Sequence, residues 1–154
     1  MTSTADRAAT GIDPRGPRFT AAITLVVFAV ALLLSDAAPG VAAVITGVQA
    51  VLFAIGAGLG VQKTPTGLLF RRLVRPRLAP PAELEDPAPP RFAQAVGLVF
   101  AVVATIGFAT GAVLLGQVAA ALAFVAAFLN AVFAFCLGCE MYLLGLRITR
   151  RSAA

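Results

Sequence analysis

The sequence contains no histidine, and only 12% of its 154 residues are charged. Histidine is the usual nitrogen ligand of zinc and the commonest general base, so its absence excludes histidine-based catalytic triads and ordinary zinc-hydrolase sites. The sequence also lacks a glycine-rich phosphate-binding loop, and it has no strand pattern that would carry one. The sequence therefore fits none of these three classes: enzymes with a histidine-based triad, ordinary zinc hydrolases and proteins with a glycine-rich phosphate-binding loop.

Cysteine is nearly absent too, since it occurs only as Cys136 and Cys139. Two cysteines so close in sequence cannot form a disulfide framework that staples distant parts of the chain. They form a C-x-x-C motif, and Glu140 follows directly. On a continuous helix the three side chains would lie within about 100° of one another, on one face. Cys136, Cys139 and Glu140 are therefore the candidate catalytic residues, without an assigned reaction.

Hydrophobic residues, in contrast, make up 60% of the sequence, and the mean hydropathy is +0.94. A soluble domain of this length has no interior large enough for so many apolar side chains, whereas a lipid bilayer solvates them. The net charge of +5 would suggest a nucleic-acid partner in a soluble protein. In a membrane protein, arginines in cytoplasmic loops explain this charge, and no nucleic-acid partner is expected.

Four apolar segments follow one another along the chain, separated by turn-forming or charged connections. We therefore predict an all-α membrane protein with four transmembrane helices in two hairpins. The predicted spans are residues 19–34, 41–61, 92–115 and 118–146. The predicted divisions are an N-terminal tail over 1–17, a transmembrane domain over 18–147 with a loop over 62–91, and a basic C-terminal tail over 148–154. The short first span also fits a signal peptide cut near Ala37.

The distribution of the twelve Lys and Arg residues predicts the orientation. All of them lie in the N-terminal tail, the long loop or the C-terminal end, and the two short connections contain none. The positive-inside rule then predicts a multi-pass protein of the cell inner (plasma) membrane with both termini in the cytoplasm. Within the loop, Leu69, Phe70 and Leu73 recur at helical spacing among arginines. We expect this amphipathic segment to lie in the membrane interface, against anionic headgroups.

Small and polar residues within the spans are expected to pack the helices. Gly56 and Gly60 have the four-residue spacing that lets two membrane helices approach closely. Gly116 is expected to lie in the tight turn between the third and fourth spans. Tyr142 is expected to anchor the chain at the interface. Three side-chain amides are expected to hydrogen-bond between helices, and they are Gln49, Gln94 and Asn130.

The predicted depth of the cysteines follows from a continuous helix over 118–146. At about 1.5 Å per residue, Cys139 lies about 12 Å and Cys136 about 16 Å from Arg147, in the cytoplasmic half of the bilayer. A position late in a helix, beside a carboxylate and in low dielectric, disfavours a thiolate. A redox site would then need a cation, or proton transfer by Glu140, which could instead pair with Arg147. The candidate cations are Arg18, Arg91 and Arg147.

Residues 89–94, Pro-Pro-Arg-Phe-Ala-Gln, and residues 127–140, which end in Cys-Leu-Gly-Cys-Glu, resemble a bacterial membrane family known as domain of unknown function 4395. The resemblance extends from about Ile12 to Arg147, and its most specific motif is Cys-Leu-Gly-Cys-Glu followed by Tyr142. It implies a four-span architecture but does not indicate any activity. The association of this family with thioredoxin-fold and rhodanese-like neighbours implies traffic of thiols or of sulfane sulfur.

These observations lead to one expected function and two alternatives. We expect Cys136 and Cys139 to take part in thiol–disulfide or sulfane-sulfur exchange with a cytosolic partner, such as a thioredoxin-like or rhodanese-like protein. No cofactor is expected for this exchange. The first alternative is a protein whose cysteine pair binds a soft metal, Cu(I) or else Zn, with cysteines from a second copy in a homo-oligomer. The second alternative is a non-catalytic accessory subunit of a larger membrane complex.

Overall fold

The computed structural model describes residues 11–152, and all regular secondary structure in that range is helical. The four long helices are α2 (Arg15–Leu34), α3 (Pro39–Leu59), α5 (Ala88–Ala109) and α6 (Val113–Phe133). The other two α-helices are α4 (Pro65–Leu69) and α7 (Leu137–Ser152). Short 3₁₀ and π-helical turns are η1 (Val61–Lys63), η2 (Phe70–Val74) and η3 (Arg75–Arg77). The predicted all-α fold class is confirmed.

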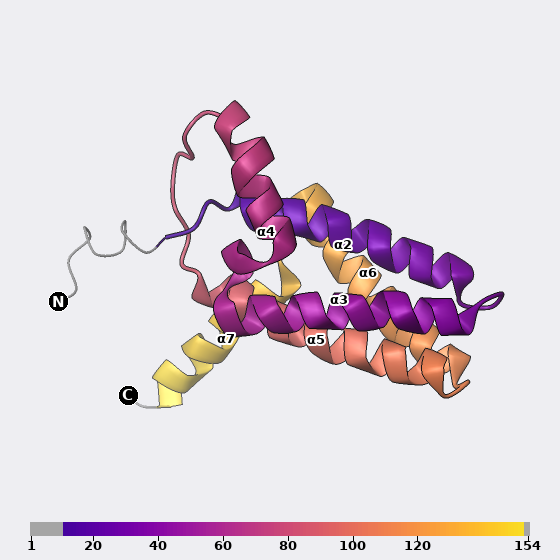
Figure 1. Cartoon of the computed structure of the whole chain (residues 1–154). Helices are drawn as coiled ribbons and strands as arrows, with labels where there is room; N and C mark the ends of the chain where they lie inside the picture. The colour runs from indigo at the N-terminus through magenta and orange to yellow at the C-terminus, as the bar shows by residue number, and fades with distance from the viewer. Residues whose placement is uncertain (1–10, 153–154) are drawn as a thin grey trace.

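The four long helices form a closed ring in which each packs against two others. α3 lies between α2 and α5, and α6 closes the ring between α5 and α2 (Figure 1). The two short connections, at residues 35–38 and 110–112, lie together at one end of this bundle. Residues 11–14, the central connection and α7 lie at the other end. We call this second end the basic end, because every Lys and Arg residue from 11 to 152 belongs to it.

Each long helix is long and apolar enough to cross a membrane. The helices have 20 to 22 residues, and at 1.5 Å per residue this gives about 30–33 Å, which matches the hydrocarbon core of a bilayer. Large apolar side chains face outward, and Leu33 and Leu114 are 83% and 74% exposed. Lipid solvates such side chains, whereas water would not. The protein is therefore a multi-pass membrane protein.

The interior of the bundle is built largely from alanine, with Phe28 and Phe108 among its few large side chains. Small residues let membrane helices approach closely, so that packing itself holds the helices together. At Gly56 an added Cβ would lie 2.6 Å from Oε1 of Gln94 on α5, which supports the predicted packing role of this glycine. Gly60, with a φ of 99°, instead ends α3.

Hydrogen bonds between the long helices use threonine and glutamine side chains. Thr105 of α5 donates to Thr46 of α3 over 3.0 Å. Gln49 of α3 donates to Thr24 of α2 over 3.4 Å, so the interhelical bond predicted for Gln49 is confirmed. These bonds connect α3 to both of its neighbours in the ring, which fixes the register of the helices against one another.

The turn between α5 and α6 falls at residues 110–112, where Gly111 has a φ of 82°. The prediction of a turn at Gly116 is wrong, because Gly116 lies inside α6. The missing side chain at Gly116 serves close packing, since an added Cβ would lie 2.5 Å from the ring of Phe108 on α5. A glycine that reads as a turn signal in the sequence thus allows two helices to touch.

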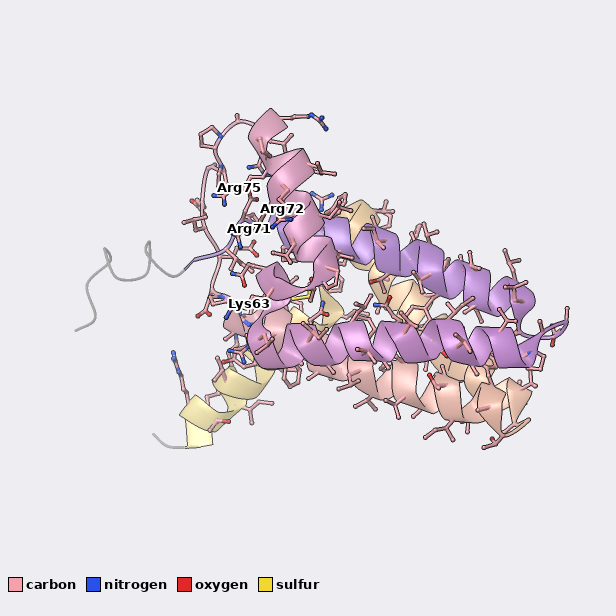
Figure 2. All side chains as sticks on the ribbon, viewed as in Figure 1. Lys63, Arg71, Arg72 and Arg75 are labelled. Carbon is pink, nitrogen blue, oxygen red and sulfur yellow. A yellow bond between two sulfur atoms is a disulfide. The ribbon has the colours of Figure 1, made fainter. Side chains whose placement is uncertain are left out.

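Basic residues of the central connection gather at the basic end. Figure 2 shows Lys63, Arg71, Arg72 and Arg75 along the helical segment that follows α3. On the same segment Phe70 is only 3% exposed, and its ring packs against a phenylalanine of α2. The segment therefore has an apolar contact with the bundle and a charged side, as its amphipathic sequence predicts. Its position in the membrane interface stays a prediction.

N-terminal residues hold the far part of the central connection. Ile12 and Glu85 form an isolated antiparallel bridge with two backbone hydrogen bonds of 2.9 Å each. Arg15 forms a salt bridge with Asp13 at 2.8 Å and donates to the carbonyl oxygen of Ala79 at 3.0 Å. The hydrogen bond from Arg15 holds the pKa of Asp13 below its ordinary value, because it stabilises the carboxylate. The connection is therefore tied back to the basic end.

Candidate thiol site

The apolar segment that contains the cysteines is two helices and not one. α6 ends at Phe133 and α7 begins at Leu137, which corrects the expectation of one helix over 118–146. Ala134 adopts a left-handed φ of 57°, and the next N–H group turns back to the carbonyl oxygen of Leu129 over 3.2 Å. Glycine is the usual residue at such a helix ending, and a left-handed alanine costs about 1–2 kcal/mol. Because the break occurs at an alanine, and not at a glycine or proline, the sequence does not indicate where α6 ends.

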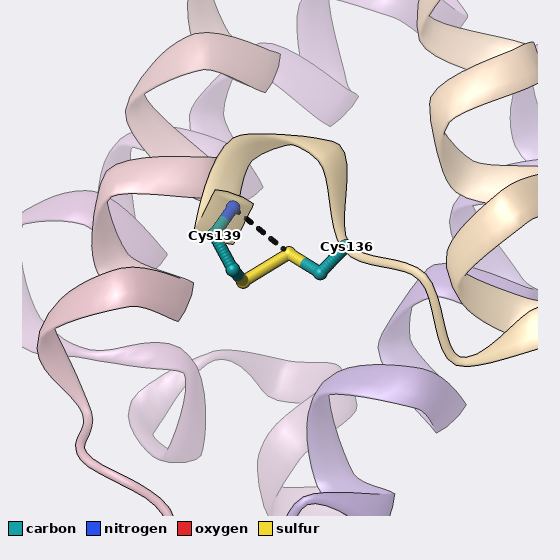
Figure 3. The surroundings of a disulfide bond; sticks show 2 residues. All are labelled: Cys136 and Cys139. Atoms are coloured by element: carbon teal, nitrogen blue, oxygen red, sulfur yellow. Dashed lines mark hydrogen bonds between the residues drawn. A yellow bond between two sulfur atoms is a disulfide. The ribbon is translucent and has the colours of Figure 1, made fainter. Parts of the chain in front are cut away.

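Cys136 is the residue just before α7, and Cys139 lies in the first turn of that helix. The two cysteines form a disulfide, with Cα atoms 5.2 Å apart (Figure 3). The N–H of Cys139 also donates to Sγ of Cys136 over 3.3 Å, and the N–H of Glu140 donates to the carbonyl oxygen of Cys136 over 3.0 Å. Cys136 thus occupies the N-cap position, where its sulfur replaces the usual side-chain oxygen.

This placement reverses the electrostatics expected for the cysteine pair. The start of a helix carries free N–H groups and the positive end of the helix dipole, and both stabilise a thiolate. The expectation of a position late in a helix was wrong because α6 ends before Cys136. The expected depth changes as well, since both cysteines follow the end of the α6 span and lie at the basic end of the bundle.

Two of the three candidate cations contact helix ends instead of sulfur. Arg18 donates to the carbonyl oxygen of Ala131, in the last turn of α6, over 3.3 Å. Arg91 donates to the carbonyl oxygens of Ala57 and Gly58, at the end of α3, over 3.2 and 2.7 Å. A cation at the C-terminal end of a helix satisfies free carbonyl groups and complements the helix dipole. Arg18 and Arg91 therefore stabilise the basic end of the bundle.

Glu140 and Arg147 are both exposed on α7. The only salt bridge in the described part of the chain joins Asp13 and Arg15, so the pairing of Glu140 with Arg147 is not formed. Glu140 lies in the first turn of α7, where a negative charge is favourable to the helix dipole. Because it is accessible and adjacent to Cys139, it stays the candidate proton donor or acceptor for that thiol.

The cysteine motif packs against the start of α5. Gly138, between the two cysteines, lies so close to Ala93 that an added Cβ would be 2.6 Å from the Cα of Ala93. One turn further along α7, the ring of Tyr142 lies 5.7 Å from the ring of Phe92. The two motifs that carry the family resemblance are thus in contact. The sequence identified both motifs, but it did not predict that they meet or that Gly138 is the point of closest approach.

The arrangement can support reversible thiol chemistry. Cys136 and Cys139 can change between dithiol and disulfide without movement of another helix, because both belong to one turn. A permanent disulfide over this short loop would constrain the unfolded chain very little, which argues against a purely structural role. Over residues 11–152, no three His, Cys, Asp or Glu side chains come together as a metal site. A metal held by the pair would therefore need ligands from elsewhere.

The fold and the site define a four-span membrane protein with a disulfide-bonded cysteine pair at the start of α7. The chain matches the family described as Domain of unknown function (DUF4395) over residues 12–147, and it belongs to that family. The resemblance seen in the sequence is thereby confirmed. No match was found among curated proteins or among solved structures. Because the description of this family names no activity, a function has to be argued from the geometry of the site.

Proposed function

We propose that this protein exchanges disulfide bonds or sulfane sulfur with a thiol-containing partner protein in the cytoplasm, through Cys136 and Cys139. The observation that carries this proposal is the N-cap position of Cys136, with the N–H of Cys139 directed at its sulfur. A cysteine that only fills space needs no such position, whereas a reactive cysteine needs a stabilised thiolate. Both cysteines are also half-buried, which leaves them accessible to a partner.

The geometry favours different roles for the two cysteines. In disulfide exchange a thiolate attacks one sulfur, and the other sulfur leaves as a thiolate. The start of α7 stabilises the thiolate of Cys136, so Cys136 is the better leaving group and the partner attacks Cys139. A second thiol of the partner then breaks the mixed disulfide and releases Cys139. The partner ends with a disulfide, and the Cys136–Cys139 pair ends as a dithiol that has taken up two protons.

The proposed side of the membrane rests on the distribution of charge. All Lys and Arg residues of the described chain belong to the same end of the bundle as the cysteines. The positive-inside rule assigns such an end to the cytoplasm. The cytoplasm is reducing and does not preserve permanent disulfides, which favours a transient, reactive pair.

Labelling tests this orientation. In a background with Cys136→Ser and Cys139→Ser, a membrane-impermeant maleimide should label Asp36→Cys in intact cells. It should label Arg72→Cys only after the cells are permeabilised, because that residue belongs to the basic end. The reverse pattern would place the thiol site and its partner on the outer side of the membrane.

Exchange itself is tested with glutathione as the probe. Oxidised, purified protein is mixed with excess reduced glutathione, quenched with acid and alkylated, and the adduct is located by fragment-ion mass spectrometry. We expect a transient adduct on Cys139 and then a dithiol. In the opposite direction, oxidised glutathione should convert the dithiol to the internal disulfide, seen as the loss of two hydrogens. Cys136→Ser and Cys139→Ser should each block formation of the internal disulfide. An adduct only on Cys136 would reverse the two roles.

Two other results would refute the proposed function. Copper or zinc bound in a fixed ratio to the purified protein, and lost in both cysteine variants, would replace exchange with metal binding. Thiols that always stay reduced, metal-free and unlabelled by a membrane-permeant reagent would leave only the accessory-subunit alternative. Elemental analysis and alkylation of the same preparation distinguish these results.

A further inference from the structure

A cavity of about 280 Å³ lies between the helices and reaches Cys136. Its wall is formed by α2, α3, α5 and α6, together with Cys136 and the start of α7. Most of the lining is apolar, as at Phe53 and Phe100. Leu122 and Met141 line the cavity and are also 52% and 54% exposed, so the cavity adjoins the lipid-facing surface. Its size is near the lower end of small-molecule sites, about 300 Å³.

Two side-chain amides in the cavity wall, Gln94 of α5 and Asn130 of α6, make no hydrogen bond to any residue that the structure describes. The interhelical bonds predicted for them are therefore not formed, in contrast to Gln49. Neither amide is fully enclosed, so a molecule in the cavity can reach them. An amide left without a partner in an apolar region is costly. Gln94 and Asn130 thus point to a ligand that carries hydrogen-bond acceptors.

Exchange with a partner also needs a source of oxidising power. Each partner that gains a disulfide leaves the Cys136–Cys139 pair as a dithiol, and renewal of the disulfide removes two electrons and two protons. An acceptor that reaches Cys136 through an apolar cavity in a membrane must dissolve in lipid. It must also accept two electrons with two protons and present oxygen atoms to the two amides. Membrane quinones have all of these properties.

We propose that the cavity binds the ring of a lipid-soluble quinone, which oxidises the Cys136–Cys139 dithiol back to the disulfide. This inference rests on the proposed exchange function and supplies its electron acceptor. The roles of the cysteines agree with the cavity, because Cys136 lines it and Cys139 does not. When the partner attacks Cys139, the sulfur of Cys136 leaves as a thiolate. The same cysteine lines the cavity in which the quinone would bind.

The electrons and atoms of this step balance. The Cys136 thiolate forms a bond to a ring carbon of the quinone, and the ring takes up its electron pair. The Cys139 thiolate then attacks the Cys136 sulfur, so that the sulfur–sulfur bond forms and the carbon–sulfur bond breaks. The electron pair stays on the ring, and the two protons of the original thiols end on the two ring oxygens. The products are the disulfide and a hydroquinone. Gln94 and Asn130 donate hydrogen bonds to the ring oxygens as negative charge develops on them.

The test uses the reduced, full-length protein in lipid nanodiscs and decylubiquinone as the probe, without oxygen. We expect the quinone absorbance to fall and the internal disulfide to form in equal amounts. Cys136→Ser and Cys139→Ser should both abolish the reaction. Gln94→Leu and Asn130→Leu should each raise the quinone concentration for half-maximal rate by about fivefold to tenfold, as expected for one lost hydrogen bond.

A matched pair of variants on α6 tests the cavity itself. Ala126 lines the cavity, whereas its neighbour Val125 is exposed and does not. Ala126→Phe should therefore prevent quinone reduction, and Val125→Phe should leave the rate unchanged. Glutathione exchange should persist in both, which shows that the site is folded. If Ala126→Phe does not fold, the Asn130→Leu variant carries the same test.

The outcomes separate this inference from the function on which it rests. If glutathione exchange proceeds but the wild-type protein does not reduce the quinone, the quinone proposal is overturned and the exchange function stands. Equal rates in Ala126→Phe and Val125→Phe would also overturn it, because the reaction would not need the cavity. If the folded protein performs neither reaction, the exchange function itself fails.

Discussion

Replacement of Gly138 by alanine should disturb the thiol site far more than the addition of one methyl group suggests. The new Cβ would lie 2.6 Å from the Cα and 2.7 Å from the Cβ of Ala93 on α5. Carbon atoms in van der Waals contact are about 3.5–4.0 Å apart, so the start of α7 would have to move by about 1 Å. The contacted atoms of Ala93 belong to or adjoin the backbone of α5, so they cannot move aside as the end of a flexible side chain could.

The size of the effect follows from two opposing contributions. Overpacking of this kind costs about 1–3 kcal/mol, whereas alanine in a helix is favoured over glycine by about 1 kcal/mol. Gly145 on the same helix supplies the matched control, because an added Cβ there meets nothing within 4 Å. Gly145→Ala gains the propensity without the clash. The difference in α7 stability between the two variants is therefore expected to be about 1–3 kcal/mol.

Amide hydrogen exchange followed by mass spectrometry measures this difference, because it reports local opening of α7 apart from unfolding of the bundle. Exchange in the first turns of α7 should be about fivefold to more than hundredfold faster in Gly138→Ala than in Gly145→Ala. Addition of Ala93→Gly removes only the contact with Cβ and leaves the contact with Cα, so it should restore protection only in part. Equal exchange in Gly138→Ala and Gly145→Ala would refute the close packing of α7 on α5.

Three further predictions follow from the site and the bundle. In the reduced protein at neutral pH, iodoacetamide should alkylate Cys136 faster than Cys139, and equal rates by mass spectrometry would contradict thiolate stabilisation by the start of α7. Arg91→Met should lower the free energy of unfolding by about 1 kcal/mol, measured by circular dichroism, while glutathione exchange is unchanged. The free energy of unfolding of Gly116→Ala should be about 1–3 kcal/mol lower than that of Gly40→Ala, because both gain the helix propensity of alanine but only the Cβ at residue 116 meets the ring of Phe108.

Much of the fold is readable in the sequence because transfer into lipid depends on the composition of each segment alone. The element boundaries are less readable. α5 begins at Ala88, earlier than the predicted start at residue 92, and includes Pro89 and Pro90. Prolines usually keep a chain extended, but the first turn of a helix tolerates them because its N–H groups have no helical partner. Arg15 likewise opens α2 ahead of the predicted start at residue 19.

The candidate site was only partly predictable. The C-x-x-C spacing identifies Cys136 and Cys139 as a pair, because residues three apart in sequence are close in any compact backbone. The helix break before the pair has no local signal, because alanine is a strong helix former and the left-handed conformation of Ala134 is unusual for it. We infer that docking of α7 on α5 stabilises this break, through contacts such as that between Gly138 and Ala93.

By itself, the sequence determined that this is a four-span membrane protein with one pair of thiols, because hydropathy and spacing are properties of single segments. The tertiary structure alone decided that the thiols lie at the start of a helix, and that Cys136 shares a cavity with Gln94 and Asn130. The physical reason is that both features come from contacts between helices distant in sequence. Such contacts depend on the relative positions of the helix backbones, which cannot be predicted from any one segment of the sequence.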